Sequence, residues 1–255
     1  MNQKEIILQL RKNINKNISM IGIIENYGIE SNFKIGKSIL ITVKTDHLWC
    51  YLTSENKDDL DQILKKFKFQ TLYFASLEDW MLSVISKHRE FEWELKTERL
   101  ILPKTAELKN LDQNKPDSSN ENKNDLETEF KLRRLKPDDT NFIFAHSHYQ
   151  QFTSKAYIKE RIKADCSAGI IIDEKLAAWG LTHDDGALGF IHVREDFRKR
   201  GFARLIMQKL ISDKRKNKKD VFLNVEPNNL KAKKLFNSFG FEFDRMISWI
   251  KLKEK

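Results

Sequence analysis

The sequence predicts an α/β protein built on a mixed, mostly antiparallel sheet flanked by helices. Three observations predict this class. Helix-like and strand-like segments alternate through residues 130–255, a second alternating set fills residues 1–103, and a polar stretch at 104–129 separates them. A chain of 255 residues is long enough for one large domain or two modest ones.

The N-terminal part has its own apolar periodicity. Ile6, Ile7, Leu10 and Ile14 indicate an opening helix. The segments that follow predict a hairpin, then a strand between two helices, then a final strand: 38–44 and 47–52 as the hairpin, 58–67 as helix, 71–75 as strand, 76–88 as helix with Ser76 as its N-cap, and 91–102 as strand.

Residues 104–129 have few apolar side chains, one proline and many Asn, Asp, Lys and Ser residues. Such a composition is typical of a linker or a mobile loop. The alternative is an irregular surface loop within a single domain. On the first interpretation, the chain has an N-terminal α/β domain at 1–103 and a second domain at 130–255.

The second part predicts a longer series of elements. A strand from Lys131 comes first, and two helices follow at 138–152 and 154–164. An antiparallel meander of three strands covers 168–193, with turns at Asp173-Glu174 and Asp184-Asp185-Gly186. The series ends with a helix from 202 whose buried face carries Phe202, Ile206 and Leu210, a strand at 221–225, a helix capped by Asn228 or Asn229 and ended by Gly240, and a last strand.

The stretch from Ile191 to Ala203 carries the strongest functional signal. It predicts a strand that runs into a basic, glycine-containing turn and then opens a helix. Successive backbone N–H groups at a helix N-terminus form a site for phosphate. Gly201 lets a diphosphate approach the backbone closely, and Arg198, Lys199 and Arg200 add positive charge.

The turn matches the pattern R-x-x-G-x-A through Arg198, Gly201 and Ala203, and it resembles the pyrophosphate-binding turn of the GNAT superfamily of acyl-CoA-dependent N-acyltransferases. The order of elements from Lys131 onward is also similar to the GNAT fold. A later stretch resembles the second GNAT signature, through Asn229, Ala232, Leu235, Phe236, Gly240 and Phe241.

Within the superfamily, the chain is most similar to the glycine N-acyltransferase-like branch. The residues behind this are Tyr157-Ile158, Arg161-Ile162, Cys166-Ser167, Ala178-Trp179, Gly186 and Trp249. The N-terminal part echoes the second half of a GNAT domain but has no R-x-x-G-x-A turn. It is therefore expected to be a degenerate repeat that shapes the acceptor site.

The resemblance implies transfer of an acetyl or other acyl group from acyl-CoA to a primary amine, with glycine as one example. Strand 187–193 would pair with the pantetheine arm. The residues implied in cofactor binding are Ile191, His192, Val193, Arg198, Lys199, Arg200, Gly201, Phe202, Ala203, Asn229 and Phe236.

Catalytic groups depart from the family pattern. Ala187 stands where many members carry a general base, and Gly189, two residues further on, cannot take a proton either. Phe236 stands where many members carry a tyrosine acid. His192 is one candidate base, although strand alternation points it away from Ala187 unless a bulge intervenes. Glu226 is the other.

His183, Asp184 and Asp185 are interpreted as turn residues. The resulting hypothesis is an acyltransferase whose amine is deprotonated through water or by a non-standard base.

Charge and composition limit the alternatives. Residues 130–255 carry a net charge of +11, residues 1–103 carry +1, and the polar stretch carries −3. The positive part suits an anionic ligand such as CoA. A CoA-binding regulatory module without turnover and a basic nucleic-acid-binding protein are the other readings, the latter disfavoured because the aromatic residues are expected in the core.

Other properties are expected from the same composition. Two cysteines suit a reducing compartment, and we expect a cytoplasmic protein without a membrane segment or a metal site. His146 and His148 are two residues apart on an expected helix and do not share a face. The oligomeric state does not follow from the sequence.

Overall fold

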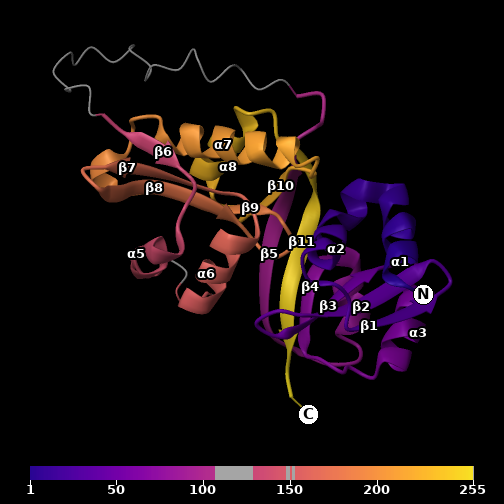
Figure 1. The fold of residues 1–255 in the computed structure, drawn as a ribbon. Helices are drawn as coiled ribbons and strands as arrows, with labels where there is room; N and C mark the ends of the chain where they lie inside the picture. Colours follow the sequence, from indigo (N-terminus) through magenta and orange to yellow (C-terminus); the bar gives the residue numbers. More distant parts are fainter. Residues whose placement is uncertain (107–128, 148–149, 151–152, 255) are drawn as a thin grey trace.

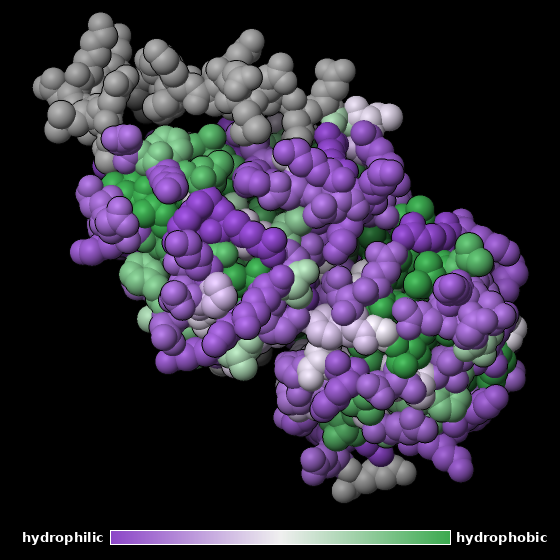
Figure 2. All heavy atoms as spheres, viewed as in Figure 1, coloured by the Kyte–Doolittle hydropathy of each residue, from purple (hydrophilic) through white to green (hydrophobic). Residues whose placement is uncertain are grey.

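The computed structural model describes residues 1–106, 129–147, 150 and 153–254. Eleven strands form one mixed sheet in the order β1-β2-β3-β4-β11-β5-β10-β9-β8-β7-β6. Figure 1 shows this sheet running through the whole molecule, and the space-filling view in Figure 2 shows that the molecule has two lobes. The predicted α/β class with a mixed, mostly antiparallel sheet is confirmed.

The N-terminal lobe follows the predicted order with additions. The single opening helix predicted from Ile6 to Ile14 is two helices, because a 3-10 turn at Arg11–Asn13 separates α1 from α2, which continues to Tyr27. A strand that sequence reasoning missed, β1, pairs with the first strand of the hairpin. The elements are α1 (Gln3–Leu10), a 3-10 turn (Arg11–Asn13), α2 (Ile14–Tyr27), β1 (Ser31–Ile35), β2 (Ser38–Lys44), β3 (Leu48–Thr53), α3 (Lys57–Phe67), β4 (Tyr73–Glu78), α4 (Asp79–Ile85) and β5 (Phe91–Ile101).

The predicted N-cap at Ser76 is wrong. Ser76 lies within β4 at a left-handed φ of 58°, and α4 begins three residues later with Glu78 as its N-cap. The Ser76 hydroxyl instead accepts a hydrogen bond from the buried guanidinium of Arg99. A tertiary contact therefore overrides the local capping preference of serine.

The second lobe has the predicted order of one strand, two helices, three strands, helix, strand, helix and strand. Its first helix is shorter than the predicted 138–152, and His148 and the end of that predicted helix lie outside the described residues. The elements are β6 (Lys131–Arg133), a 3-10 turn (Pro137–Asp139), α5 (Thr140–Ala145), α6 (Lys155–Ala164), β7 (Ser167–Ile172), β8 (Lys175–Thr182), β9 (Leu188–Val193), a 3-10 turn (Glu195–Phe197), α7 (Phe202–Lys216), β10 (Phe222–Val225), α8 (Leu230–Asn237) and β11 (Glu242–Leu252).

The lobes exchange strands at the centre of the sheet. β11, the last strand of the chain, lies between β4 and β5, and β5 lies between β11 and β10. β5 and β11 are both 11 residues long and pair antiparallel along most of their length. Each lobe therefore completes its sheet with a strand from the other. The predicted linker at 104–129 lies mostly outside the described residues.

Apart from β6 at one edge, the sheet order is symmetric about the β5–β11 pair. On each side, a meander of three strands leads through a helix to a strand, a second helix and the exchanged strand, as β1–β5 with α3 and α4, and β7–β11 with α7 and α8. α1 and α2 cover one face of the first lobe, where α5 and α6 cover the matching face of the second. This repetition supports the expectation that the N-terminal part is a degenerate copy of the same fold.

The strand exchange predicts that neither lobe folds alone. A fragment of residues 130–255 lacks β5, so β10 and β11 would each expose an unpaired edge. We expect it to show no cooperative thermal transition by circular dichroism, and mixing with a 1–103 fragment to restore the transition of the full chain. A fragment 130–255 that melts cooperatively at the temperature of the full chain would contradict this prediction.

Candidate functional site

A β-bulge in β9 determines which side chains face each side of the sheet. Leu181 pairs with Gly189 and Trp179 with His192, so two residues of β9 stand opposite one residue of β8. The bulged residue is Phe190, which has a left-handed φ of 53°. The bulge was an open alternative in the sequence analysis, and it reverses the orientation of His192.

Because of the bulge, His192 lies on the same face as Gly189, the face covered by α5 and α6. Its ring stacks on Trp179 with centroids 4.3 Å apart and an interplanar angle of 17°. Ile191 and Val193 point to the opposite face and pack against the core under α7 and α8. The three residues predicted to line the cofactor therefore sit on two faces of one strand.

β9 and β10 form a fork. The two strands are parallel, and their register consists of one pair, Leu188 opposite Leu223. Beyond this pair β10 continues beside β5 and β9 continues beside β8. The inner edge of β9 after Leu188 is thus separated from β10, in the position where an added extended chain could pair with it.

The basic turn leads from β9 into α7. Gly201 is the N-cap of α7 at φ 75°, and Lys199 also has a left-handed φ of 64°. A Cβ placed on Gly201 would find no heavy atom within 4 Å, so the space in front of this residue is open. Phe202 and Ala203 belong to the first turn of α7, where N–H groups have no partner within the helix.

The arginines of the turn are oriented by their neighbours. Arg198 donates to a carboxylate oxygen of Glu195 at 2.8 Å and to the carbonyl of Val193 at 3.3 Å. The Arg200 guanidinium lies over the Phe197 ring, 5.5 Å from its centroid. Arg198 and Arg200 precede Gly201, the N-cap of α7, so the turn combines a helix N-terminus with nearby basic residues in the chain, an arrangement that suits an anion.

The other predicted residues lie at the ends of β10 and α8. Glu226 is exposed directly after β10. Asn229 is the N-cap of α8, as predicted, and its Oδ1 accepts from the N–H of Ala232 at 3.1 Å. Phe236 is buried in the core under α7 and α8.

Ala187 is fully buried against Ile18 of α2 and Phe222 of β10. The position at which the resemblance leads us to expect a base is therefore filled by contact with the N-terminal lobe.

His183 is a candidate that the sequence analysis assigned to a turn. It follows β8, and its imidazole lies directly over Gly189, so that a Cβ on Gly189 would overlap Nε2 of His183. The ring also contacts Phe190, with centroids 4.9 Å apart. The only sequence signal for this position was the absence of a side chain at Gly189, which leaves room for a neighbouring group.

The hairpin that carries His183 is fastened by both lobes. Asn26 of α2 donates to the carbonyl of Asp184 at 2.7 Å, and the N–H of Asp184 donates to the hydroxyl of Tyr157 in α6 at 3.1 Å. α2 passes so close that a Cβ on Gly22 would collide with the carbonyl of Asp185.

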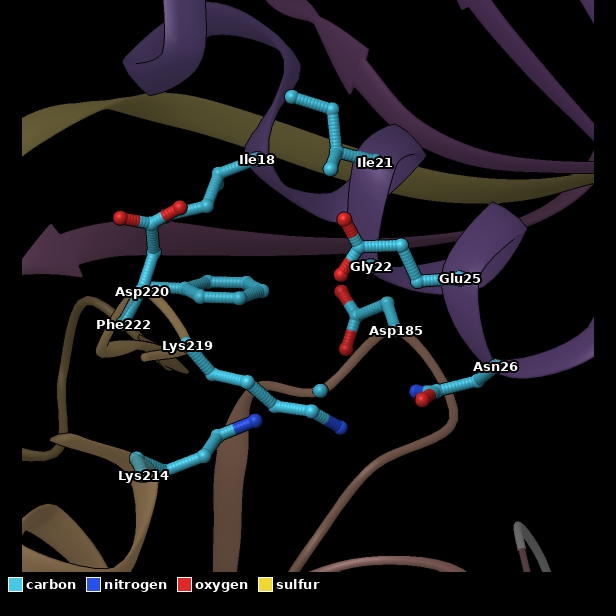
Figure 3. A pocket seen from close by; sticks show the side chains of 11 residues that line it. Ile18, Ile21, Gly22, Glu25, Asn26, Asp185, Lys214, Lys219, Asp220 and Phe222 are labelled. Carbon is cyan, nitrogen blue, oxygen red and sulfur yellow. The ribbon is translucent and has the colours of Figure 1, made fainter. Parts of the chain in front are cut away.

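Figure 3 shows the resulting pocket, in which Asp185 faces Glu25 and Asn26 of α2 and the side chains of Lys214 and Lys219. One carboxylate oxygen of Asp185 accepts from the N–H of Ala187 at 3.0 Å. Its other oxygen is buried and has no partner among the described residues.

A buried ion-pair network supports the hairpin from the α7 side. Asp165 pairs with Lys214 at 3.2 Å and with Lys219 at 3.4 Å, and its carboxylate and the Lys214 ammonium are both 2% exposed. Arg161 is fully buried and donates to the carbonyl and hydroxyl of Thr182, one residue before His183. Burial alone would raise the pKa of Asp165, but the two lysines outweigh it and lower the pKa to about 2.

Among the described residues, no three His, Cys, Asp or Glu side chains are grouped so that they could hold a metal ion. Within the same residues, no helix combines the length and the apolar character needed to cross a membrane. Cys50 and Cys166 are both free and buried.

Comparison with known proteins identifies one family model and a set of solved structures that resemble this chain. The model of the FR47-like protein family matches residues 168–250, which run from β7 to β11 and include the fork and the turn. None of the curated proteins matches the sequence.

Solved structures share the fold over both lobes at low sequence identity. A Drosophila protein superposes with a TM-score of 0.69 at 16% identity, covering 88% of this chain and 77% of its own. A GCN5-related N-acetyltransferase from Kribbella flavida gives 0.59 at 9% identity, covering 94% and 96%. A tandem GNAT protein from the clavulanic acid biosynthesis pathway gives 0.52 at 11% identity, covering 94% and 88%. The chain thus has a GNAT fold.

The buried network predicts a pH dependence of stability. The lowered pKa of Asp165 means that its ionised form stabilises the fold above the unfolded pKa of about 3.9, and that this contribution is lost as the pH falls toward 2. Asp165→Asn should lower the free energy of unfolding at pH 7 by about 3 kcal/mol, because Lys214 loses its partner. Between pH 5 and 2, the variant should also lose about 2 kcal/mol less of its free energy of unfolding than the wild type loses.

Urea titrations at several pH values measure both effects. The matched control is Asp58→Asn, an exposed carboxylate in the first turn of α3. If the free energy of unfolding falls equally with acid in the wild type and in Asp165→Asn, other carboxylates determine the loss of stability at low pH.

Proposed function

We propose that this protein transfers an acyl group from acyl-CoA to a primary amine in a ternary complex. The observation that carries the proposal is one continuous segment, Leu188–Ala203, in which an open fork leads into a basic helix N-terminus. A diphosphate would bind at one end of the segment, and an acylated pantetheine arm would reach the other.

The turn suits the pyrophosphate of CoA. Gly201 has open space in front of it, and the N–H groups at the start of α7 have no partner within the helix. In our proposal Arg198, Lys199 and Arg200 supply the positive charge, while Gly201, Phe202 and Ala203 supply the backbone donors.

The inner edge of β9 suits the pantetheine arm. Its backbone groups would pair with the amides of the arm like a further strand, along Ile191, His192 and Val193. Asn229 and Phe236 would lie toward the other side of the cofactor, because α8 follows β10, the second arm of the fork.

The matching region of the N-terminal lobe lacks these features. β3 and β4 correspond to β9 and β10, but they are joined by three parallel pairs from Trp49–Tyr73 to Tyr51–Ala75. The N-terminus of α3 is capped by Asn56 and followed by Asp58 and Asp59. Acidic residues at a helix N-terminus disfavour phosphate. We therefore assign CoA binding to 130–255 and place the acceptor beside α2, with residues 1–103 shaping its site.

We favour a small acceptor that carries a carboxylate, such as glycine. The net charge of +11 on residues 130–255 and the resemblance to the glycine N-acyltransferase-like branch support this choice. The two free cysteines fit a reducing compartment such as the cytoplasm.

A CoA-binding module without turnover is the second candidate. It is favoured by the burial of Ala187 at the usual base position and by Phe236, which has no hydroxyl to protonate a leaving thiolate. Nucleic-acid binding ranks below both, because the aromatic side chains of this lobe pack mainly in its cores rather than forming a stacking surface.

The proposal predicts that Gly201→Glu abolishes CoA binding. The new side chain would enter the open space at the helix N-terminus, where it would repel the diphosphate. Calorimetric titration with acetyl-CoA should show binding to the wild type, weakened by about 100-fold or more in the variant, since several charge-assisted hydrogen bonds are lost.

Leu8→Glu is the matched control, since it makes the same charge change at an exposed position of α1. The control should bind like the wild type, and thermal unfolding should show all three proteins folded. A wild type that binds neither acetyl-CoA nor longer acyl-CoAs would exclude the enzyme.

The proposal also predicts turnover. Release of free CoA thiol from acetyl-CoA should rise above the hydrolysis background when glycine or a related small amine is added, and mass spectrometry should find the N-acylated product. CoA binding with no thiol release across a broad panel of amines would favour the module without turnover.

A further inference from the structure

His183 occupies the space that a side chain at position 189 would fill. Gly189 lies on β9 one residue after Leu188, where the pairing of β9 with β10 ends. The imidazole Nε2 of His183 lies where a Cβ on Gly189 would be. A glycine inside a strand often marks a place where another group approaches the backbone closely. Here the approaching group is an imidazole, which can take up a proton.

We propose that His183 is the general base that deprotonates the acceptor amine. The proposal rests on the acyltransferase function above, in which the acyl end of the cofactor reaches the fork. Because Ala187 at the expected base position is buried and cannot take a proton, a histidine from the preceding hairpin would act instead, beside Gly189 of β9.

The surroundings keep His183 ready to accept a proton. Burial lowers the pKa of His183 below its ordinary value, Asp185 opposes this shift, and Arg161 adds to it. Neither ring nitrogen has a hydrogen-bond partner among the described residues. The imidazole is therefore neutral at pH 7 with its nitrogens available to a ligand.

The other titratable groups of the hairpin are accounted for. Asp184 is protonated more readily than an ordinary carboxyl, because burial and Asp185 raise its pKa. Burial also raises the pKa of Tyr157 well above its ordinary range, so this hydroxyl stays neutral. Among these groups His183 is the one that both faces Gly189 and changes charge below neutral pH.

The rotation of His183 is restricted from several sides. Phe190 contacts one side of the ring, and Tyr157 lies beyond Phe190 with centroids 6.2 Å apart. Arg161 holds the carbonyl of Thr182 at 3.3 Å, directly before the histidine in the chain. A base held in one orientation assists proton transfer more than a mobile one.

The proton balance of the step is complete. The acceptor nitrogen forms a bond to the acyl carbon, and the carbon–sulfur bond breaks with its electron pair leaving on sulfur. An ammonium group loses two protons on becoming an amide N–H. One passes to Nε2 of His183 and then to solvent, and the other neutralises the CoA thiolate.

The two bases predicted from the sequence are placed less favourably. His192 stacks on Trp179 further along β9, nearer the basic turn than the point at Leu188 where β9 and β10 separate. Glu226 is exposed at the end of β10, three residues beyond the fork. Both are rival outcomes of the same experiment.

The test compares His183→Gln with the wild type by steady-state kinetics and by calorimetry with acetyl-CoA. Removing a general base lowers kcat by about 10²-fold or more, while the Kd of acetyl-CoA should be unchanged. The wild-type kcat should fall as the pH drops below neutral, because His183 becomes protonated, and this limb should be absent from the variant. His88→Gln is the control, since this histidine pairs with Asp61 in the N-terminal lobe.

A rescue variant separates a chemical role from a structural one. The φ of Gly189 is not left-handed, so this position accepts a side chain once His183 is truncated. The double variant His183→Ala/Gly189→Glu should regain about tenfold in kcat over His183→Ala, since it returns a base to the same place. Gly189→Glu alone should lose activity through its clash with the ring.

Other results would overturn the proposal. The proposal is wrong if His183→Gln keeps the kcat of the wild type. It is also wrong if the fall of kcat below neutral pH persists in His183→Gln and is lost in His192→Ala or Glu226→Gln. Parallel losses of kcat, acetyl-CoA affinity and melting temperature, with no rescue by the double variant, would show a structural role. A wild type that binds acetyl-CoA but acylates no amine would overturn the proposed function, and His183 with it.

Discussion

The pairing of β5 with β11 is the constraint on which the rest of the architecture depends. Each of these strands belongs by chain order to one lobe and completes the sheet of the other. The exchange fixes the lobes side by side and brings α2 against the β8–β9 hairpin, with Gly22 in contact with the backbone of Asp185. A wall of the candidate site is thereby built from a part of the chain that contributes nothing to the phosphate turn.

The two lobes share a fold but differ at the pair of parallel strands where the fork lies. In the second lobe β9 and β10 separate after one pair, whereas in the N-terminal lobe β3 and β4 stay paired. In the N-terminal lobe, Trp49 and Tyr73 pair across the strands with their rings 5.3 Å apart, and His47 stacks on Tyr73 at 4.1 Å. Cross-strand aromatic contacts stabilise a closed ladder. In the second lobe β9 pairs with β10 at Leu188 alone and carries a bulge at Phe190, two residues further on.

Element order was predictable from the sequence because periodicity and capping are local. Asn229, one of the two predicted caps, does cap α8, and the strands of the meander are where the sequence predicts them. The strand exchange, the bulge at Phe190 and the fate of Ser76 depend on contacts between residues far apart in the chain. His183 was interpreted as a turn residue for the same reason, since only the folded hairpin brings it over Gly189.

Moving a base from a strand to a hairpin has a structural consequence. A side chain on a central strand is oriented by the sheet, whereas a hairpin residue needs its own supports. Here Arg161 and the Asp165–Lys214 pair hold the hairpin from below, and Asn26 of the other lobe holds it from the side. Buried ions of this kind add little net stability compared with apolar packing. Their presence beside Thr182, the residue before His183, is better explained by the need to fix the position of the hairpin, which makes the inferred base dependent on both lobes.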